Sequence, residues 1–268
     1  MSADITLGQF LPGNSAVHRL DPRTKILLMI VYIVVIFLVK TLWVFLLPTL
    51  LLVFMFALAR VPASYFFSSL KPMRWLLIFM FVINIFATPG ENVLLQWWIF
   101  RFTSEAVRQA VFMTFRLILL VAGTSILTLT TSPIALTDGL EKLLSPLRKL
   151  HFPAHELAMM MTIALRFIPT LLEETDRIQK AQMARGADFE SGNLIQRAKS
   201  MIPILVPLFV SAFRRADELA MAMESRCYHG GEGRTRMREL KMHYGDLVAA
   251  LVFAFATAAI IVCERLPL

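Results

Sequence analysis

Five stretches of this sequence carry no charged side chain over nearly the length that a membrane-crossing helix needs. A helix that spans the hydrocarbon core of a bilayer takes about 20 mostly apolar residues. The stretches are Ile26–Val39, Thr41–Ala59, Trp75–Gly90, Leu117–Thr137 and Leu247–Cys263. With 57% hydrophobic and only 17% charged residues, the chain is too apolar for a soluble domain. We therefore predict an all-α integral membrane protein with about five transmembrane helices.

The segment "HRLDPRTKILL" marks the start of the first helix. Asp21 suits the N-cap position and Pro22 the first helical turn. Arg23 and Lys25 are expected to anchor this helix end in the headgroup layer. Lys40 alone separates the first two stretches, and one helix through both would be too long for a bilayer. We expect a tight hairpin at Lys40.

The basic residues indicate an orientation in the membrane. The loop "RVPASYFFSSLKPMR" holds Arg60, Lys71 and Arg74 without an acidic residue, whereas the hairpin turn holds only Lys40. By the positive-inside rule, the N-terminus and this loop are cytoplasmic, and the segment with Glu91 lies outside. The same bias accounts for the formal net charge of +8, so we expect no nucleic-acid binding.

Residues within the fourth stretch are small or hydroxylated, which favours close packing of helices in lipid. They are Ala122, Gly123, Thr124 and Ser125. No acidic or basic residue lies within any of the five stretches. Their composition argues against a proton relay or an ion-coupled carrier, because such mechanisms need a titrating group inside the membrane.

The character of the sequence changes after residue 132. The segment Pro133–Gly245 holds sixteen Lys or Arg and thirteen Asp or Glu residues. We predict transmembrane helices in residues 1–132, a cytoplasmic or interfacial region of amphipathic helices in residues 133–245, and a last transmembrane helix in residues 246–268. Turn-forming residues divide the middle region into one short and two long helices.

Both long helices are predicted to be amphipathic, because apolar residues recur at steps of three and four opposite charged ones. The stripes include Leu157, Met161, Leu165, Ile168 and Leu172 in the first helix, and Leu205, Phe209, Phe213 and Leu219 in the second. The segment Ile202–Phe213 is too short to span a bilayer. Each stripe needs a cover, either the membrane surface or another polypeptide.

The two long helices end alike. "AQMARGADFE" contains Arg185, and "AMESRCYHG" contains Arg226 forty-one residues later. Gly186 is a natural residue to end the first helix, and a cation suits the last helical turn. At the second helix end, Cys227 stands at the position that Gly186 has in the first. Helix capping alone therefore accounts for only one of the two arginines. Arginine is well suited to a partly desolvated acidic groove, because its planar fork can be held by carboxylates and carbonyls together.

Three segments resemble the transmembrane T component of energy-coupling factor (ECF) transporters. They are "LPGNSAVHRLDPRTK", "RFIPTLLEETDRIQKAQMARG" and "AMESRC", and the resemblance covers nearly the whole chain. In that family the T component joins two ABC-type ATPases to a membrane S component that binds a vitamin or metal ion. The resemblance implies a non-catalytic subunit without a cofactor, in the cell membrane of a prokaryote, whose partners are the lipid bilayer, the ATPases and the S component.

The resemblance also implies roles for individual residues. ATPase-docking residues would be Ala184, Arg185 and Gly186 at the first helix end, and Ser225, Arg226 and Cys227 at the second. The family pattern is Ala-Arg-Gly at both ends, and the second end departs from it with two other small residues. The apolar stripes are expected to face the S component.

Other functions are less compatible with the sequence. There is no GxxxxGK[ST] motif, so ATP would have to be bound by another protein. A pore-forming permease of an ordinary ABC importer would usually present a single coupling loop. A membrane-embedded enzyme would need convergent side chains, whereas the acidic candidates are expected on a solvated helix face. These candidates are Glu173, Glu174, Asp176 and Glu190. His151 and His155 have no third ligand nearby, so we expect no metal site.

Overall fold

The computed structural model describes residues 10–88, 93–97, 100–150, 152–189, 191, 193–230 and 241–265. Its helices are α1 (Pro22–Leu38), α2 (Leu46–Ala59), α3 (Ala63–Leu70), α4 (Arg74–Ala87), α5 (Ser104–Thr130), α6 (Pro133–Leu144), α7 (Ala154–Ala184), α8 (Leu194–Ser200), α9 (Ile202–Glu224) and α10 (Tyr244–Arg265). The strands β1 (Val93–Trp97) and β2 (Phe100–Thr103) form one antiparallel hairpin. The predicted all-α class is confirmed, although the short pair of strands was not predicted. Gly90, Glu91, His151 and Glu190 lie outside the described residues.

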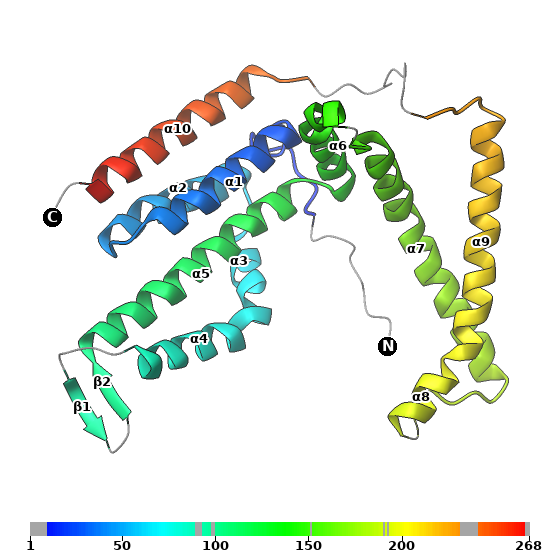
Figure 1. Cartoon of the computed structure of the whole chain (residues 1–268), viewed down its shortest axis with the longest axis horizontal. Coiled ribbons are helices and arrows are strands. Elements are labelled where there is room, and N and C mark those ends of the chain that lie inside the picture. Colours follow the sequence, from blue (N-terminus) through cyan, green and yellow to red (C-terminus); the bar gives the residue numbers. More distant parts are fainter. Residues whose placement is uncertain are drawn as a thin grey trace. The chain divides into compact units, whose positions relative to one another are not determined.

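The chain forms two compact units, residues 1–140 with 240–268, and residues 141–239. In the first unit α5 is the central helix, and α1, α2, α3 and α4 all pack against it, while α10 packs on α1 and α2 (Figure 1). The second unit is built on the long helices α7 and α9, with the short α8 between them in sequence.

Several helices have the length and composition to cross a membrane. They are the continuous pair α3–α4 at Ala63–Ala87, together with α5, α7 and α10, and the segment Trp43–Ala59 is a shorter apolar helix. The chain is therefore a multi-pass membrane protein. Although α7 is long enough, its second half carries Glu173, Glu174, Asp176 and Arg177, as expected of an amphipathic helix.

The boundaries of α5 correct the predicted fourth stretch. This helix begins at Ser104, where the Thr103 hydroxyl accepts a hydrogen bond from the Ala106 N–H (3.2 Å), and not at Leu117. It ends at Thr130 instead of Thr137, because Thr131 is extended and Pro133 opens α6. The longer helix is about 40 Å in length at 1.5 Å per residue.

The extended α5 also includes Arg116, which lies just before the fourth uncharged stretch and is therefore inside a helix of the first unit. Its guanidinium donates to the Val39 carbonyl (2.6 Å) just beyond the last residue of α1, and lies over the rings of Phe112 and Phe37. A cation at this end satisfies a carbonyl that the helix itself leaves free. Arginine stays protonated at neutral pH, so Arg116 does not supply a proton relay.

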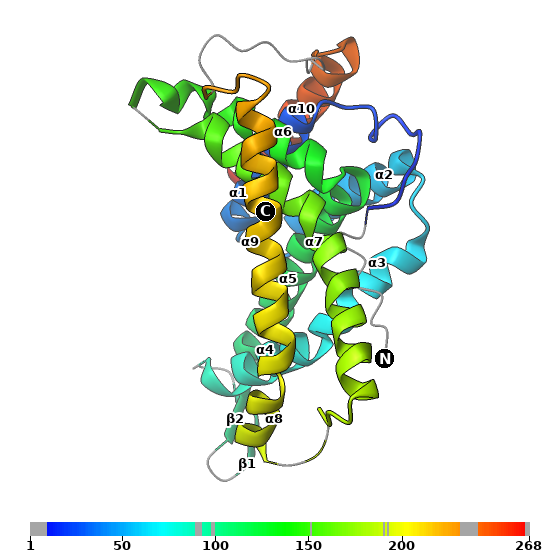
Figure 2. The ribbon, with the colours of Figure 1, turned by 90° about the vertical axis from the view of Figure 1, so that its right-hand side faces the viewer.

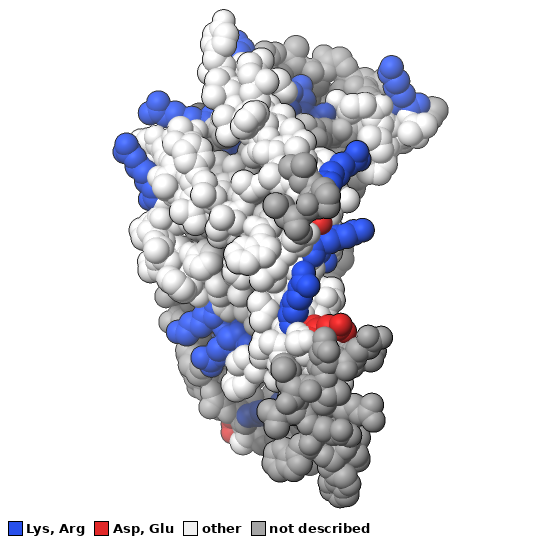
Figure 3. Space-filling view, turned by 90° about the vertical axis from the view of Figure 1, so that its left-hand side faces the viewer, with Lys and Arg blue, Asp and Glu red and all other residues white. Residues whose placement is uncertain are grey.

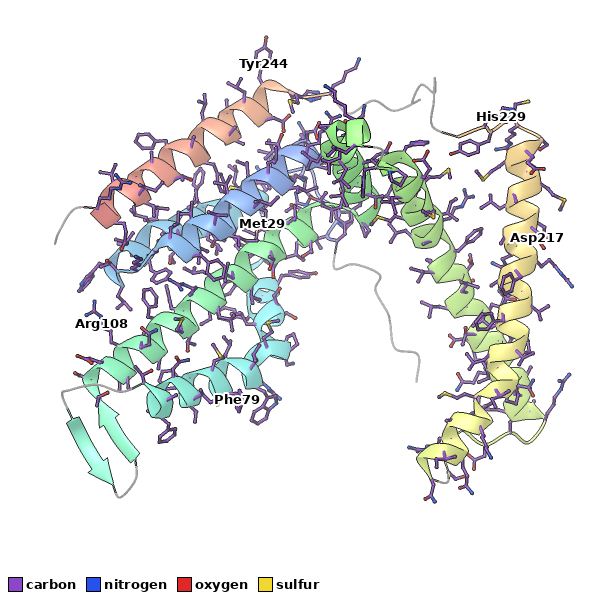
Figure 4. The ribbon with its side chains drawn as sticks, in the orientation of Figure 1. Met29, Phe79, Arg108, Asp217, His229 and Tyr244 are labelled. Carbon is purple, nitrogen blue, oxygen red and sulfur yellow. The ribbon has the colours of Figure 1, made fainter. Side chains whose placement is uncertain are left out.

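Close packing between α1 and α5 depends on Gly123. A Cβ atom added there would lie 2.3 Å from the Tyr32 ring, and the Tyr32 hydroxyl donates to the Leu119 carbonyl (3.2 Å). Ala122 is fully buried, so the predicted packing role is confirmed at these two positions. Thr124 is exposed and bonds its own helix backbone. Met29 of α1 points toward the same layer between the helices (Figure 4).

The outer surface of this unit is apolar. No residue of α3 or α4 is buried, and Phe79 points away from α5 with 61% of its surface exposed (Figure 4). Most of the face drawn in Figure 3 is uncharged, with separate basic side chains around it. A surface of this kind fits a lipid environment, where apolar side chains need no cover of protein.

A buried polar cluster joins the start of α1 to the end of α5. Lys25 is 7% exposed, and its ammonium group donates to the carbonyls of Thr130 (2.9 Å) and His18 (3.3 Å) and to the Thr131 hydroxyl (3.1 Å). The prediction that Lys25 anchors the helix in the headgroup layer is therefore wrong. The lysine points inward, because the end of α5 offers carbonyl oxygens that a cation can satisfy.

Asp246 ties α10 to the same cluster. One of its carboxylate oxygens accepts from the Asp21 N–H (2.7 Å) and the other from the His243 N–H (2.8 Å). Asp21 in turn accepts from the Arg23 N–H (3.0 Å), which confirms the predicted N-cap. The N-terminal segment "LPGNSAVHRLDPRTK" thus contains the residues that fasten three helices of the first unit to one another.

Candidate functional site

The two long helices of the second unit pack against each other and run in opposite directions. Figures 1 and 2 show α7 and α9 converging and crossing toward the end at which α8 lies, with their other ends apart. Arg185 follows the last residue of α7, and Arg226 lies two residues beyond the end of α9. Because the helices are antiparallel, the two arginines lie at opposite ends of the pair.

The first helix end is closed by Gly186. This residue has a positive φ of 87°, and its N–H donates to the Met183 carbonyl (2.9 Å). The next N–H, that of Ala187, reaches back to the Gln182 carbonyl (3.0 Å). Backbone bonds of this kind satisfy carbonyls that the helix leaves unpaired. The prediction that Gly186 ends the first long helix is confirmed.

The second helix end has the same backbone geometry, although it lacks the glycine. Cys227 has a φ of 57°, its N–H donates to the Glu224 carbonyl (2.9 Å), and the Tyr228 N–H reaches the Met223 carbonyl (3.0 Å). Each of these hydrogen bonds corresponds to one at the first end, with donor and acceptor both forty-one residues further along the chain. The expectation that capping applies to only one arginine is wrong, because Cys227 itself adopts the left-handed conformation that glycine usually fills.

The predicted docking residues are all open to solvent. Exposed positions are Ala184, Arg185, Gly186, Ser225, Arg226 and Cys227. Among the described residues, neither arginine side chain has a hydrogen-bond or ion-pair partner. The structure therefore presents two guanidinium groups on matching helix ends, each flanked by small residues that let another surface approach.

Four of the nine residues of the predicted apolar surface are exposed within their unit. Met161, Leu205, Phe209 and Phe213 are between 44% and 66% exposed, and the last two rings stack. Those that are half-buried are Leu157, Leu165, Ile168 and Leu172. Leu219 differs from the others, because it lines the groove between α7 and α9.

One contact between the helices was not anticipated. Glu174 of α7 accepts hydrogen bonds from the Ser211 hydroxyl and from a guanidinium nitrogen of Arg215 (2.7 Å), both on α9. This carboxylate was expected on a solvated helix face. In the structure it faces α9, which the apolar spacing within a single helix could not reveal.

His155 was considered above as a metal ligand together with His151. His155 contacts Glu141 through its Nδ1 atom (3.0 Å). Among the described residues, no three His, Cys, Asp or Glu side chains are grouped as metal ligands would be. His151 lies outside these residues.

The apolar helices of the first unit and the long amphipathic helices of the second define a multi-pass membrane protein. Residues 13–237 match the family CbiQ, described as cobalt transport protein. The chain belongs to this family.

Its curated relatives carry a more specific name, energy-coupling factor transporter transmembrane protein EcfT. That of Clostridium kluyveri is 54% identical over 264 residues, covering 98% of this chain and 96% of the relative. That of Thermosediminibacter oceani is 55% identical and covers 92% of both chains. That of Bacillus subtilis is 48% identical and covers 90% of this chain and 91% of its own. The resemblance to the transmembrane component of ECF transporters is confirmed.

Proposed function

We propose that this chain couples ATP hydrolysis by two ABC-type ATPases to the uptake of a substrate through a separate S component. The chain itself would be non-catalytic and would lie in the cell membrane of a prokaryote with its N-terminus in the cytoplasm. The substrate, a vitamin or metal ion, would be bound by the S component. The main support is the exact correspondence of backbone bonds at Arg185 and Arg226, which gives two equivalent contact points for two similar ATPases.

Each arginine would dock in an acidic groove of one ATPase. A guanidinium held by carboxylates and backbone carbonyls makes charge-assisted hydrogen bonds, which are stronger and more directional than those of an ammonium. The small neighbours Ala184 and Gly186, and Ser225 and Cys227 at the other end, would let the groove close around the helix tip. The different neighbours of Arg226 fit two ATPases that are not identical.

The S component would cover the exposed apolar residues of the long helices. Phe209 and Phe213 form an aromatic patch, and Leu205 and Met161 extend the apolar surface. Exposed apolar patches of this kind mark interaction sites, and methionine adapts its shape to different partners. A surface that adapts in this way suits a T component that serves more than one S component.

Coupling would use the two helices as levers. ATP binding draws two ABC ATPases together, so their grooves would move the helix ends that they hold. Stiff helices would transmit this motion to the apolar surface and to the S component on it. Coupling of this kind needs a two-state element that both sites bias.

Affinity purification tests this proposal. The tagged wild-type chain and the Arg185→Ala, Arg226→Ala double variant are purified in mild detergent, and the proteins that accompany them are identified. We expect two ABC ATPases and a small hydrophobic subunit with the wild type. The ATPases should be lost from the variant, because a desolvated charged contact is typically worth about 2–5 kcal/mol at an interface.

The matched control is Arg177→Ala with Arg214→Ala, which removes two cations from the same helices away from their ends. This variant should retain the ATPases. Equal recovery of the ATPases with the docking variant and the wild type would contradict the assigned docking residues. A wild-type chain that purifies alone from cells expressing the ATPases would contradict the function itself.

A further inference from the structure

Both carboxylate oxygens of Glu174 are used in contacts from α7 to α9. One accepts from the Ser211 hydroxyl and the other from Arg215 (2.7 Å). The side chains of Glu174 and Arg215 are 23% and 36% exposed, so the pair is partly shielded from water. This three-residue cluster, the Glu174 cluster, joins two helices that also meet through apolar side chains. A second, longer hydrogen bond between them runs from the Gln182 amide to the Pro203 carbonyl (3.5 Å) near the turn into α9.

Glu174 and Arg215 occupy equivalent positions in the two long helices. Glu174 and Arg215 are separated by the same forty-one residues that separate Arg185 from Arg226. Each member of the pair therefore lies eleven residues before the arginine at the end of its own helix. At 1.5 Å per residue, both helical arms are about 16 Å long. The contact thus joins equivalent positions of the two helices at equal distances from their tips.

The apolar side chains between α7 and α9 do not by themselves determine where the two helices cross. A groove of about 270 Å³ lies beside the cluster and is lined by Phe167 and Leu171 of α7 and by small residues of α9. These small residues are Ala212, Ala216 and Ala220, which follow one another at steps of four. Such a row lets two helices approach closely but offers little to prevent sliding along the axis. A polar contact within an otherwise apolar interface can fix the register of paired helices.

We propose that Glu174, Ser211 and Arg215 form the pivot of the two levers and fix the point at which α7 and α9 cross. They are positioning residues, since none of them lies at a docking tip. Equal arms mean that a displacement of one tip about the pivot corresponds to an equal displacement of the other. The two ATPases would then act symmetrically on the S component. This inference rests on the proposed function, because the arms matter only if their tips are held by the ATPases.

The experiment measures the distance between the two helical arms and the width of its distribution. Nitroxide labels are introduced as unnatural amino acids at Lys180 and Met221, which are exposed and also forty-one residues apart. Native cysteines then remain unmodified. Distances between the labels are recorded by pulsed electron resonance in the complex that copurifies with the chain, without nucleotide and with Mg-ATP and vanadate.

We expect one narrow distance distribution for the wild type in each condition, with a shift between the two. Glu174→Gln and Arg215→Gln should each broaden the distribution about twofold, because several crossing positions become populated. The exchanged pair, Glu174→Arg with Arg215→Glu, should narrow it again. Glu173→Gln and Arg214→Gln are the controls: these neighbours are exposed, are also forty-one residues apart, and should leave the distribution unchanged.

If the distance distributions of Glu174→Gln and Arg215→Gln are as narrow as that of the wild type, the pivot is wrong. It is also wrong if the distribution of the exchanged pair is as broad as those of the two single variants. Recovery of the ATPases keeps these outcomes separate from the proposed function. If the ATPases copurify with every variant while the widths stay equal, only the pivot is wrong. If they do not copurify with the wild type, the proposed function is wrong before the distances are considered.

Discussion

The ammonium group of Lys25 lies 2.9 Å from the carbonyl oxygen of Thr130, so the first turn of α1 holds the last residue of α5. The same ammonium also reaches the Thr131 hydroxyl and the His18 carbonyl. A single side chain thus satisfies three groups, one in the N-terminal segment and two at the end of α5. This arrangement explains why the N-terminal segment contributes to the fold of the whole first unit.

Replacing Lys25 with methionine should destabilise this unit by about 3 kcal/mol. Methionine has a similar length but no donor, so it leaves the Thr130 and Thr131 oxygens without their partner. Thermal unfolding of the purified chain in detergent measures the effect. Lys40→Met is the matched control, because Lys40 is exposed, and its unfolding should follow the wild type. Equal melting of the two variants would show that the buried contact contributes nothing.

Lys25 also illustrates what the sequence could and could not predict. Asp21 as the N-cap was predictable, because N-capping depends on residues within one turn. The inward direction of Lys25 was not, because its partner Thr130 is 105 residues away along the chain. A lysine at the start of an apolar helix has the same local sequence whether it points to headgroups or to another helix.

The same distinction applies to the candidate site. Spacing within each helix predicted the apolar stripes, the arginine ends and the closing role of Gly186. The contact between Glu174 and Arg215 depends on how two helices face each other, which periodicity does not specify. Nor could propensity predict that Cys227 adopts a positive φ, since this conformation is uncommon for residues other than glycine.

Gly123→Ala should destabilise the packing of α1 on α5 by about 1–3 kcal/mol. The added methyl would lie 2.3 Å from the Tyr32 ring, which cannot move freely while its hydroxyl is bonded to Leu119. Thermal unfolding in detergent measures the loss. Combining the change with Tyr32→Leu should recover part of it, because the smaller side chain frees space. If the double variant is destabilised by as much as the two single variants added together, the two residues do not clash in this way.

The two helix ends should respond in opposite ways to substitution at their closing residues. Gly186→Ala places a Cβ atom at a φ of 87° and should cost about 1 kcal/mol. Cys227→Gly relieves a positive φ and should stabilise its helix end by about 0.5 kcal/mol, after the greater entropy of glycine in the unfolded chain is subtracted. Helix content during thermal unfolding, followed by circular dichroism, checks both. Cys263→Gly is a control without this benefit, because glycine inside α10 lowers helix stability.

Conservative substitution of the arginines distinguishes a requirement for charge from one for shape. We expect Arg185→Lys and Arg226→Lys each to weaken binding of the ATPases about tenfold, because a lysine keeps the charge but cannot make the paired hydrogen bonds of a guanidinium. Neither arginine has a partner among the described residues, so the substitution removes no contact within the chain that the structure shows. Titration of purified ATPases against the chain in nanodiscs measures the affinity at fixed salt. Lysine variants that bind as the wild type does, beside alanine variants that do not, would show that the grooves recognise charge alone.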